Sequence, residues 1–230
     1  MPTQKSRTDR FLNMGLILIL GISLALIGNP AWAASEEQMI VDKSEMSLQT
    51  IYKENAWFRD HAKEAKAIYI VPSLLRGAFI FGGAGGSGVL IVKKPDGSWS
   101  EPGFYTMGSA SFGLQIGADA SEIVVVVRTQ RGLEAFYSTD FRFGGDLSVA
   151  VGPSGAGARG GGLTGDFVSF AKSKGAYAGV SVDGQGVATS DTANMNYYGK
   201  TVRPTDIFVK GSVSNPGSKS LRATADKLLK

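Results

Sequence analysis

Apolar and polar residues alternate in short runs between residues 67 and 117, and 11 of the 31 glycines of the chain fall among these runs. Apolar runs of this length that end in Gly or in Pro-Asp-Gly predict strands joined by tight turns. Ala110, Phe112, Leu114 and Ile116 lie on one side of an extended chain, as in a half-buried strand. We therefore expect a β-meander on which the rest of the chain packs.

A hairpin turn is predicted inside this stretch, from Lys93 to Trp99. Pro95 presets the φ angle of a turn, and Gly97 can adopt the positive φ that closes it. Further strands are predicted at residues 122–127, 147–151, 164–172 and 176–182. The first of these contains four consecutive valines, so both of its faces should be buried.

Residues 35–66 show helical spacing of their apolar positions, with Val41, Leu48, Ile51 and Phe58 on one face and a break expected near residues 55–57. Two interpretations remain open: the face docks on the core of the same chain, or it lies on a membrane surface. The polar face mixes acidic and basic residues, which is not typical of a membrane-surface helix.

The last part of the chain turns polar and then helical. Residues 191–199 are expected to form a loop or a short turn, and residues 205–208 could open a short helix. Leu221, Ala225 and Leu228 lie on one face of a terminal helix that Ser218 can cap. The predicted fold class is therefore α+β. It comprises a curved, mostly antiparallel, glycine-rich sheet, open or closed into a barrel, with helices before and after it.

The first 33 residues are typical of a secretory signal peptide. Lys5, Arg7 and Arg10 precede an apolar run at residues 11–26, and Ala31-Trp32-Ala33 forms a small-x-small cleavage site. The run is short for a membrane span, which needs about 20 residues, although an uncleaved anchor is the alternative. We expect cleavage after Ala33, export, and a location in the periplasm or at the outer membrane. Residues 34–66 would then be a helical segment and residues 67–230 a β-rich domain.

Composition narrows the function classes. Removing the leader lowers the net charge from +4 to +2, so bulk charge does not favour a nucleic-acid partner. The absence of cysteine removes disulfides, thiol catalysis and the common structural zinc sites. His61 is the only histidine, and no G-x-S-x-G motif is present, so a serine-hydrolase arrangement is not indicated. We expect neither an enzyme nor a cofactor.

Residues 83–88 match G-x-G-x-x-G, but a strand follows them where nucleotide binding needs a helix. A second match at residues 155–160 has no helix after it either, so no nucleotide is expected. In this interpretation Gly83, Gly85 and Gly88 shape the backbone of a strand.

Several of these segments together resemble the SYLF domain. They are AKAIYIVPS at residues 65–73, GGAGGSG at 82–88, DGSWSEP at 96–102 and GLQIG at 113–117, with residues 124–127 and 175–181 also fitting. The resemblance spans about residues 46–211. It implies a non-enzymatic lipid-binding module. Eukaryotic members bind phosphoinositides and in some cases actin, and bacterial members are exported. The family carries no agreed catalytic set.

The resemblance implies that the protein binds anionic phospholipid at a bacterial cell envelope. We expect the binding site to be formed by Arg76, Lys93, Lys94 and Trp99. Lysine and arginine are attracted to an anionic bilayer, and tryptophan favours the headgroup region. In the alternative, the two lysines keep a strand edge soluble and Trp99 is part of the core. The alternative function is an envelope structural or adhesion protein, with a protein partner such as a host protein or actin, for which lipid affinity is incidental.

Overall fold

The computed structural model describes residues 35–78, 81–112, 117–145, 147–151, 165–173 and 175–230. The predicted signal peptide and the predicted strand positions Leu114 and Ile116 lie outside these residues. The helices are α2 (Glu36–Glu54), α3 (Ala56–Ala62), α4 (Gln130–Ala135), α5 (Asp191–Tyr198), α6 (Pro204–Phe208), the 3-10 turn η1 (Pro216–Ser218) and α7 (Lys219–Leu228). The strands are β1 (Ala67–Ala78), β2 (Phe81–Val92), β3 (Gly103–Phe112), β4 (Gly117–Val127), β5 (Asp140–Arg142), β6 (Val149–Val151), β7 (Phe167–Ser173), β8 (Ala176–Gly179) and β9 (Gly186–Thr189).

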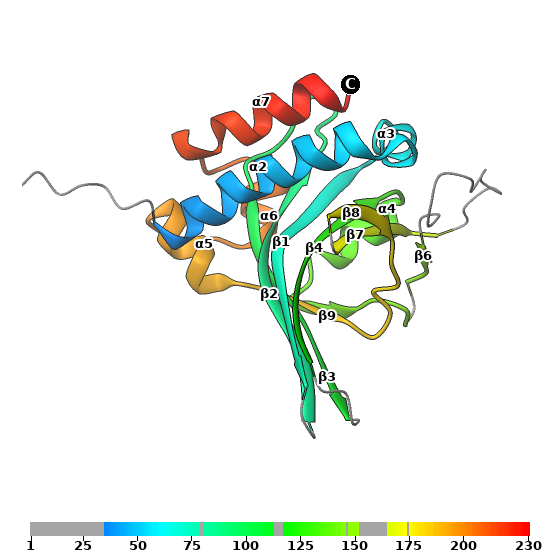
Figure 1. Ribbon diagram of the computed structural model, residues 1–230. Coiled ribbons are helices and arrows are strands. Elements are labelled where there is room, and N and C mark those ends of the chain that lie inside the picture. The colour runs from blue at the N-terminus through cyan, green and yellow to red at the C-terminus, as the bar shows by residue number, and fades with distance from the viewer. Residues whose placement is uncertain (1–34, 79–80, 113–116, 146, 152–164, 174) are drawn as a thin grey trace, which may run out of the picture. The chain divides into compact units, whose positions relative to one another are not determined.

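The nine strands in the described part of the chain form one strongly curled sheet in the order β5-β9-β3-β2-β1-β4-β7-β6, with β8 also paired to β7 (Figure 1). Each neighbouring pair is antiparallel except β6 and β7, which are parallel. The predicted α+β class and the curved, mostly antiparallel sheet are confirmed.

The predicted meander is confirmed for β1, β2 and β3, and the strand that follows them does not extend it. β4 pairs with β1 on the side away from β2, so the spatial order of the first four strands is 3-2-1-4. This is a Greek key, in which the fourth strand returns to lie beside the first. The sequence pattern indicates a strand at residues 122–127 but contains no signal for which edge of the meander it joins.

A β-bulge interrupts the central strand β1 at Pro72. The register of β1 shifts against β2 between Ile70 and Leu75, and against β4 between Val71 and Leu74. Proline has no N–H to donate to a neighbouring strand, so a proline inside a sheet is confined to an edge or a bulge. Because β1 has a partner strand on each side, the bulge is what allows Pro72 to occupy this strand.

Glycines of β2 provide the space that the bulge needs. A Cβ atom on Gly86 would overlap with the carbonyl oxygen of Ser73, and one on Gly88 would overlap with the carbonyl oxygen of Ile70. Gly88 therefore shapes the backbone as the sequence analysis expects. By contrast, a Cβ on Gly85 would meet no atom within 4 Å. The close approach of β1 thus explains two of the glycines in β2. A Cβ on Gly83 would lie 3.3 Å from the carbonyl oxygen of Ser109 in β3, and only for Gly85 does the prediction find no close neighbour.

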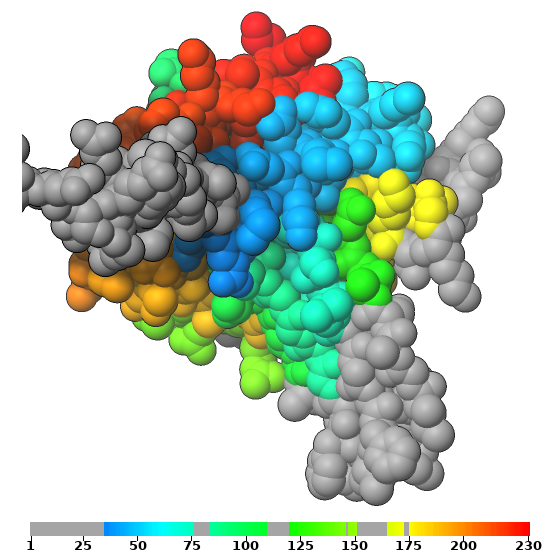
Figure 2. Space-filling view, turned by 60° about the vertical axis from the view of Figure 1, so that its left-hand side comes forward, coloured from blue at the N-terminus to red at the C-terminus, as the bar shows by residue number. Residues whose placement is uncertain are grey.

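One face of the sheet is covered by α2, α3 and α7, which lie side by side in Figure 1 and again in the space-filling view of Figure 2. Val41, Leu48, Ile51 and Phe58 are buried against this face, which confirms the docked alternative for the first helical segment. The predicted break is also confirmed. Asn55 caps α3, and its side chain accepts a hydrogen bond of 2.8 Å from the backbone N–H of Phe58.

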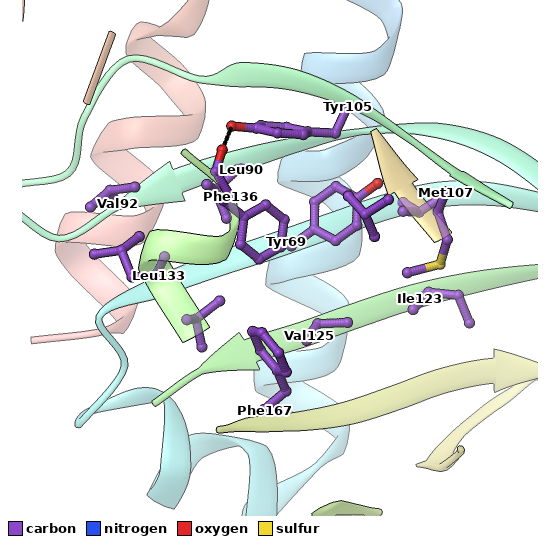
Figure 3. Close-up of a cluster of buried hydrophobic side chains, with 14 of the residues drawn as sticks. Tyr69, Leu90, Val92, Tyr105, Met107, Ile123, Val125, Leu133, Phe136 and Phe167 are labelled. Carbon is purple, nitrogen blue, oxygen red and sulfur yellow. Dashed lines mark hydrogen bonds between the residues drawn. The ribbon is translucent and has the colours of Figure 1, made fainter. Parts of the chain in front are cut away.

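An aromatic cluster fills the other face of the sheet, where α4 packs (Figure 3). The ring of Phe136 lies 5.3 Å from the rings of both Tyr69 and Tyr105, and 6.2 Å from that of Phe167. The Tyr105 hydroxyl donates a 2.6 Å hydrogen bond to the carbonyl oxygen of Phe136. The side chains of residues 124–127 are buried on both faces of the sheet, as the four valines predict.

The prediction of a loop or a short turn at residues 191–199 is wrong, because α5 occupies Asp191–Tyr198. Its Asn194 is fully buried, and the Asn194 side chain accepts from the N–H of Phe104 and donates to the carbonyl oxygen of the same residue. Gly199 ends the helix in the left-handed region at φ 68°. The polar residues of α5 interrupt the hydrophobic pattern, so that pattern does not indicate a helix here. A glycine directly after the last helical residue is nevertheless a recognised signal for a helix end.

We predict that Gly88→Ala lowers the free energy of unfolding by about 1–3 kcal/mol, the usual cost of overpacking a filled core. The added methyl group would have to displace the backbone of Ile70 in the central strand. Gly85→Ala, in the same strand, is the matched control and should change stability little. Urea unfolding of both variants provides the measurement, and equal stability of the two would contradict the assigned role of Gly88.

Candidate functional site

Basic residues from separate parts of the sequence meet at one end of the sheet. Ala67 pairs with both Val92 and Val127, and Val127 pairs with Phe167. The residues just outside these pairs, Lys93, Lys66, Arg128 and Asp166, therefore lie side by side in that order. Strands are about 4.8 Å apart, so the row spans about 14 Å.

Backbone hydrogen bonds continue the sheet through this row. The N–H of Lys93 donates to the carbonyl oxygen of Lys66 at 2.8 Å, and the N–H of Lys66 donates to that of Val127 at 2.8 Å. The N–H of Arg128 donates to the carbonyl oxygen of Asp166 at 2.9 Å. The row is thus part of the rigid sheet. We call its basic residues and their lysine neighbours the basic rim, which consists of Lys63, Lys66, Lys93, Lys94, Arg128 and Lys230.

Lys93 connects the basic rim to two helix ends. Its Nζ donates to the carbonyl oxygen of Lys63 at 3.3 Å and to that of Leu229 at 3.2 Å, at the C-terminal ends of α3 and α7. It also lies 6.0 Å from the centre of the Trp99 ring. An ammonium group at a helix C-terminus satisfies exposed carbonyls and the helix dipole. Lys93 therefore has a structural role, whatever else it contacts.

Two of the four predicted site residues do not share this surface. Trp99 is 1% exposed, and its backbone N–H donates to Asp226 at 3.2 Å, so the structure supports the alternative in which Trp99 belongs to the core. Arg76 lies nine residues along β1 from Ala67 and pairs with Ala84 and Asp119. At about 3.3 Å per residue, Arg76 is about 30 Å from the basic rim.

Lys94 is exposed in the predicted hairpin turn. Its backbone N–H donates to the carbonyl oxygen of Ser98, and Gly97 has the positive φ of 83° that the sequence analysis predicts. Lys63, Lys66 and Lys230 are also exposed. Sequence reasoning missed Lys66 and Arg128, because their proximity to Lys94 follows from strand order. The only signal in the sequence is that each stands directly beside a predicted strand.

A polar cavity of about 270 Å³ opens beside the basic rim and is lined by Glu64, Arg128, Thr129, Arg131, Ser148 and Asp166. Asp166 is 3% exposed and accepts hydrogen bonds from three side chains, those of Arg131 (2.5 Å to Nη2), Thr129 (2.6 Å) and Ser148 (3.2 Å). Burial opposes ionisation of Asp166, but these hydrogen bonds outweigh burial and lower its pKa to about 2.

The side chain of His61 contacts Trp57, one turn earlier in α3. His61 Nδ1 lies 2.9 Å from the carbonyl oxygen of Trp57, and the centres of the Trp57 and His61 rings lie 4.0 Å apart, with the ring planes tilted by 32°. Within the ranges that the structure describes, no three acidic or histidine side chains are placed to hold a metal ion. The same ranges contain no helix with both the length and the hydrophobicity to cross a membrane.

Comparison with known proteins identifies the family. Residues 108–228 match the family model Ysc84, described as Las17-binding protein actin regulator. The chain belongs to this SYLF family. The matched residues contain Arg128, Arg131 and Asp166. The other residues of the basic rim lie outside the match: Lys63, Lys66, Lys93 and Lys94 precede it, and Lys230 follows it.

The relatives are longer proteins than this chain. LAS seventeen-binding protein 3 of Saccharomyces cerevisiae is 36% identical over 148 residues, which cover 61% of this chain and 32% of the yeast protein. Protein YSC84 of the same yeast is 34% identical over 145 residues, covering 60% and 30%. The human SH3 domain-containing YSC84-like protein 1 is 32% identical over 149 residues, covering 63% and 43%. The matched part of the SYLF chain thus covers between 30% and 43% of the length of these relatives.

We predict that Asp166→Asn destabilises the SYLF chain and removes part of its acid sensitivity. The folded-state pKa of about 2 lies below the usual value of about 3.9, so Asp166 stabilises the fold above about pH 4. This contribution, about 2 kcal/mol, disappears as the pH falls from about 4 to 2. Unfolding measured across that range should show a shallower pH dependence in the variant. Asp140→Asn, at an exposed carboxylate, is the control, and parallel curves for wild type and Asp166→Asn would contradict the assignment.

Proposed function

We propose that this SYLF chain is a non-enzymatic module that binds anionic phospholipid through the basic rim. The observation that carries the proposal is the register of the sheet, which brings Lys66, Lys93 and Arg128 to one end of it. Exposed Lys63, Lys94 and Lys230 extend the same surface. A lysine or arginine near an anionic membrane surface contributes about 1 kcal/mol, so several together support reversible binding.

The interior of the fold supports a surface mode of binding. Aliphatic and aromatic side chains fill the face of the sheet where an enclosed lipid would have to lie. The cavity beside the basic rim, at about 270 Å³, is polar and falls below the usual size of ligand pockets. Lipid headgroups would therefore be recognised at the surface, and the acyl chains would stay in the bilayer.

We predict that Lys66→Glu combined with Lys94→Glu weakens binding to anionic vesicles by at least about tenfold, because two attractive charges become repulsive. Lys93 is left unchanged, since its ammonium group caps two helices. Lys43→Glu with Lys219→Glu makes the same change in net charge at exposed positions on α2 and α7. Co-sedimentation with vesicles, at low and high salt, compares the two double variants.

Equal loss of binding in both double variants would show that net charge alone matters and would remove the basic rim from the proposal. No binding of the wild type to any anionic vesicle would overturn the lipid function. The second candidate, a protein-interaction module, would then be favoured, because the similar yeast protein is named for binding Las17 and the family description names actin regulation.

We also propose that the chain is exported and that its mature form begins at Ala34. The basic, apolar and Ala-Trp-Ala segments of the first 33 residues support this proposal. N-terminal sequencing of the protein purified from its native cells should find Ala34 at the start. An intact Met1 end in the membrane fraction would support an uncleaved anchor, and an intact Met1 end in the soluble fraction would contradict export.

A further inference from the structure

The cavity beside the basic rim has a charge arrangement of its own. Arg128 and Arg131 contribute two positive charges to its wall, and Glu64 and Asp166 contribute two negative charges. Its lining is therefore balanced, whereas the neighbouring rim is basic. A ligand that carried only phosphate would face two carboxylates there, and one that carried only an amine would face two guanidinium groups.

The two carboxylates differ in what they can offer a ligand. Asp166 already accepts hydrogen bonds from Arg131, Thr129 and Ser148, including the backbone N–H of Ser148 at 3.0 Å. Its oxygens are therefore occupied by the protein. Glu64 is exposed in the segment between α3 and β1 and faces the same cavity. Glu64 is thus the carboxylate that a ligand can reach.

The guanidinium group of Arg131 stays accessible in spite of its ion pair. Its side chain is 65% exposed, while that of Asp166 is 4% exposed. The carboxylate of Asp166 accepts hydrogen bonds from Nε and Nη2 of Arg131. The ion pair therefore fixes the orientation of Arg131, while most of its side chain is exposed to solvent. Phosphate oxygens suit this planar donor.

We propose that this cavity binds a phosphate ester that also carries a primary amine. The phosphate would lie against Arg128 and Arg131, and the ammonium group would lie against Glu64. Within the proposed membrane-binding function, on which this inference rests, the ligand is a phosphoethanolamine headgroup. At about 270 Å³ the cavity has room for a headgroup without its acyl chains. The same chemistry occurs in soluble phosphoethanolamine.

Vesicles test the lipid form of the ligand. Two preparations share the same anionic fraction, and the remainder is either phosphatidylethanolamine or phosphatidylcholine, whose quaternary ammonium cannot donate a hydrogen bond to Glu64. The wild type should bind the ethanolamine vesicles more tightly, by up to about fivefold, which is the factor for one exposed ion pair. Glu64→Gln should lose this preference while it keeps its affinity for the anionic lipid.

Asp60→Asn removes a nearby exposed carboxylate that does not line the cavity, and it should keep the preference. A wild type without preference, or a Glu64→Gln variant that retains it, would overturn the inference and leave the function of the basic rim intact. If neither preparation is bound, the membrane function fails, and the soluble compound tests the cavity alone.

The soluble titration follows the backbone amide signals of Thr129 and Ser148 by NMR. Phosphoethanolamine should shift both signals in the wild type and shift them less in Glu64→Gln. Phosphocholine and inorganic phosphate are the comparison compounds, and they should produce smaller shifts at equal concentration. Equal shifts with all three compounds, or none with phosphoethanolamine, would contradict the amine contact.

Discussion

The fold depends on the fit between a bulge in β1 and the glycines of β2. Pro72 cannot donate a hydrogen bond, yet it occupies a strand with partners on both sides. The bulge in β1 accommodates the missing N–H of Pro72. At this bulge the carbonyl oxygens of Ile70 and Ser73 lie so close to β2 that only glycine fits at positions 86 and 88. β1 pairs with β2 and β4 and contributes side chains to both hydrophobic cores. A displacement of the β1 backbone at the bulge would therefore disturb the packing on both faces of the sheet.

Burial on both faces decides where this protein can present charge. Helices α2, α3 and α7 cover one side of the central strands, and the aromatic cluster with α4 covers the other. Charged side chains are rarely buried without partners, and Lys66, Lys93 and Arg128 stand just beyond the ends of the central strands. The strand register then decides which charges become neighbours. This is why Lys66, Lys93 and Arg128 form one surface although two segments of more than 25 residues separate them.

Local chemistry could be predicted from the sequence, and long-range pairing could not. Asn55 marks the break between the first two helices, and Gly97 closes the hairpin turn, because capping and positive φ depend on neighbouring residues alone. The four valines correctly indicate a strand that is buried on both faces. No local sequence signal indicates that β4 pairs with β1. The predicted site therefore combined Arg76 and Lys93, which lie at opposite ends of one hairpin, and it treated a core residue, Trp99, as a surface anchor.

The charged residues at this end of the sheet separate into two groups. Lys93 is held by helix carbonyls, and Arg131 and Asp166 hold each other, so changing any of them alters the fold together with the surface. Lys66, Lys94 and Glu64 are exposed side chains carried on the same rigid backbone. Members of the first group fix the positions of the second, so that replacing one of them changes stability together with any ligand contact it makes. Substitutions that report on binding therefore belong to the second group, because only there can lost affinity be separated from lost stability.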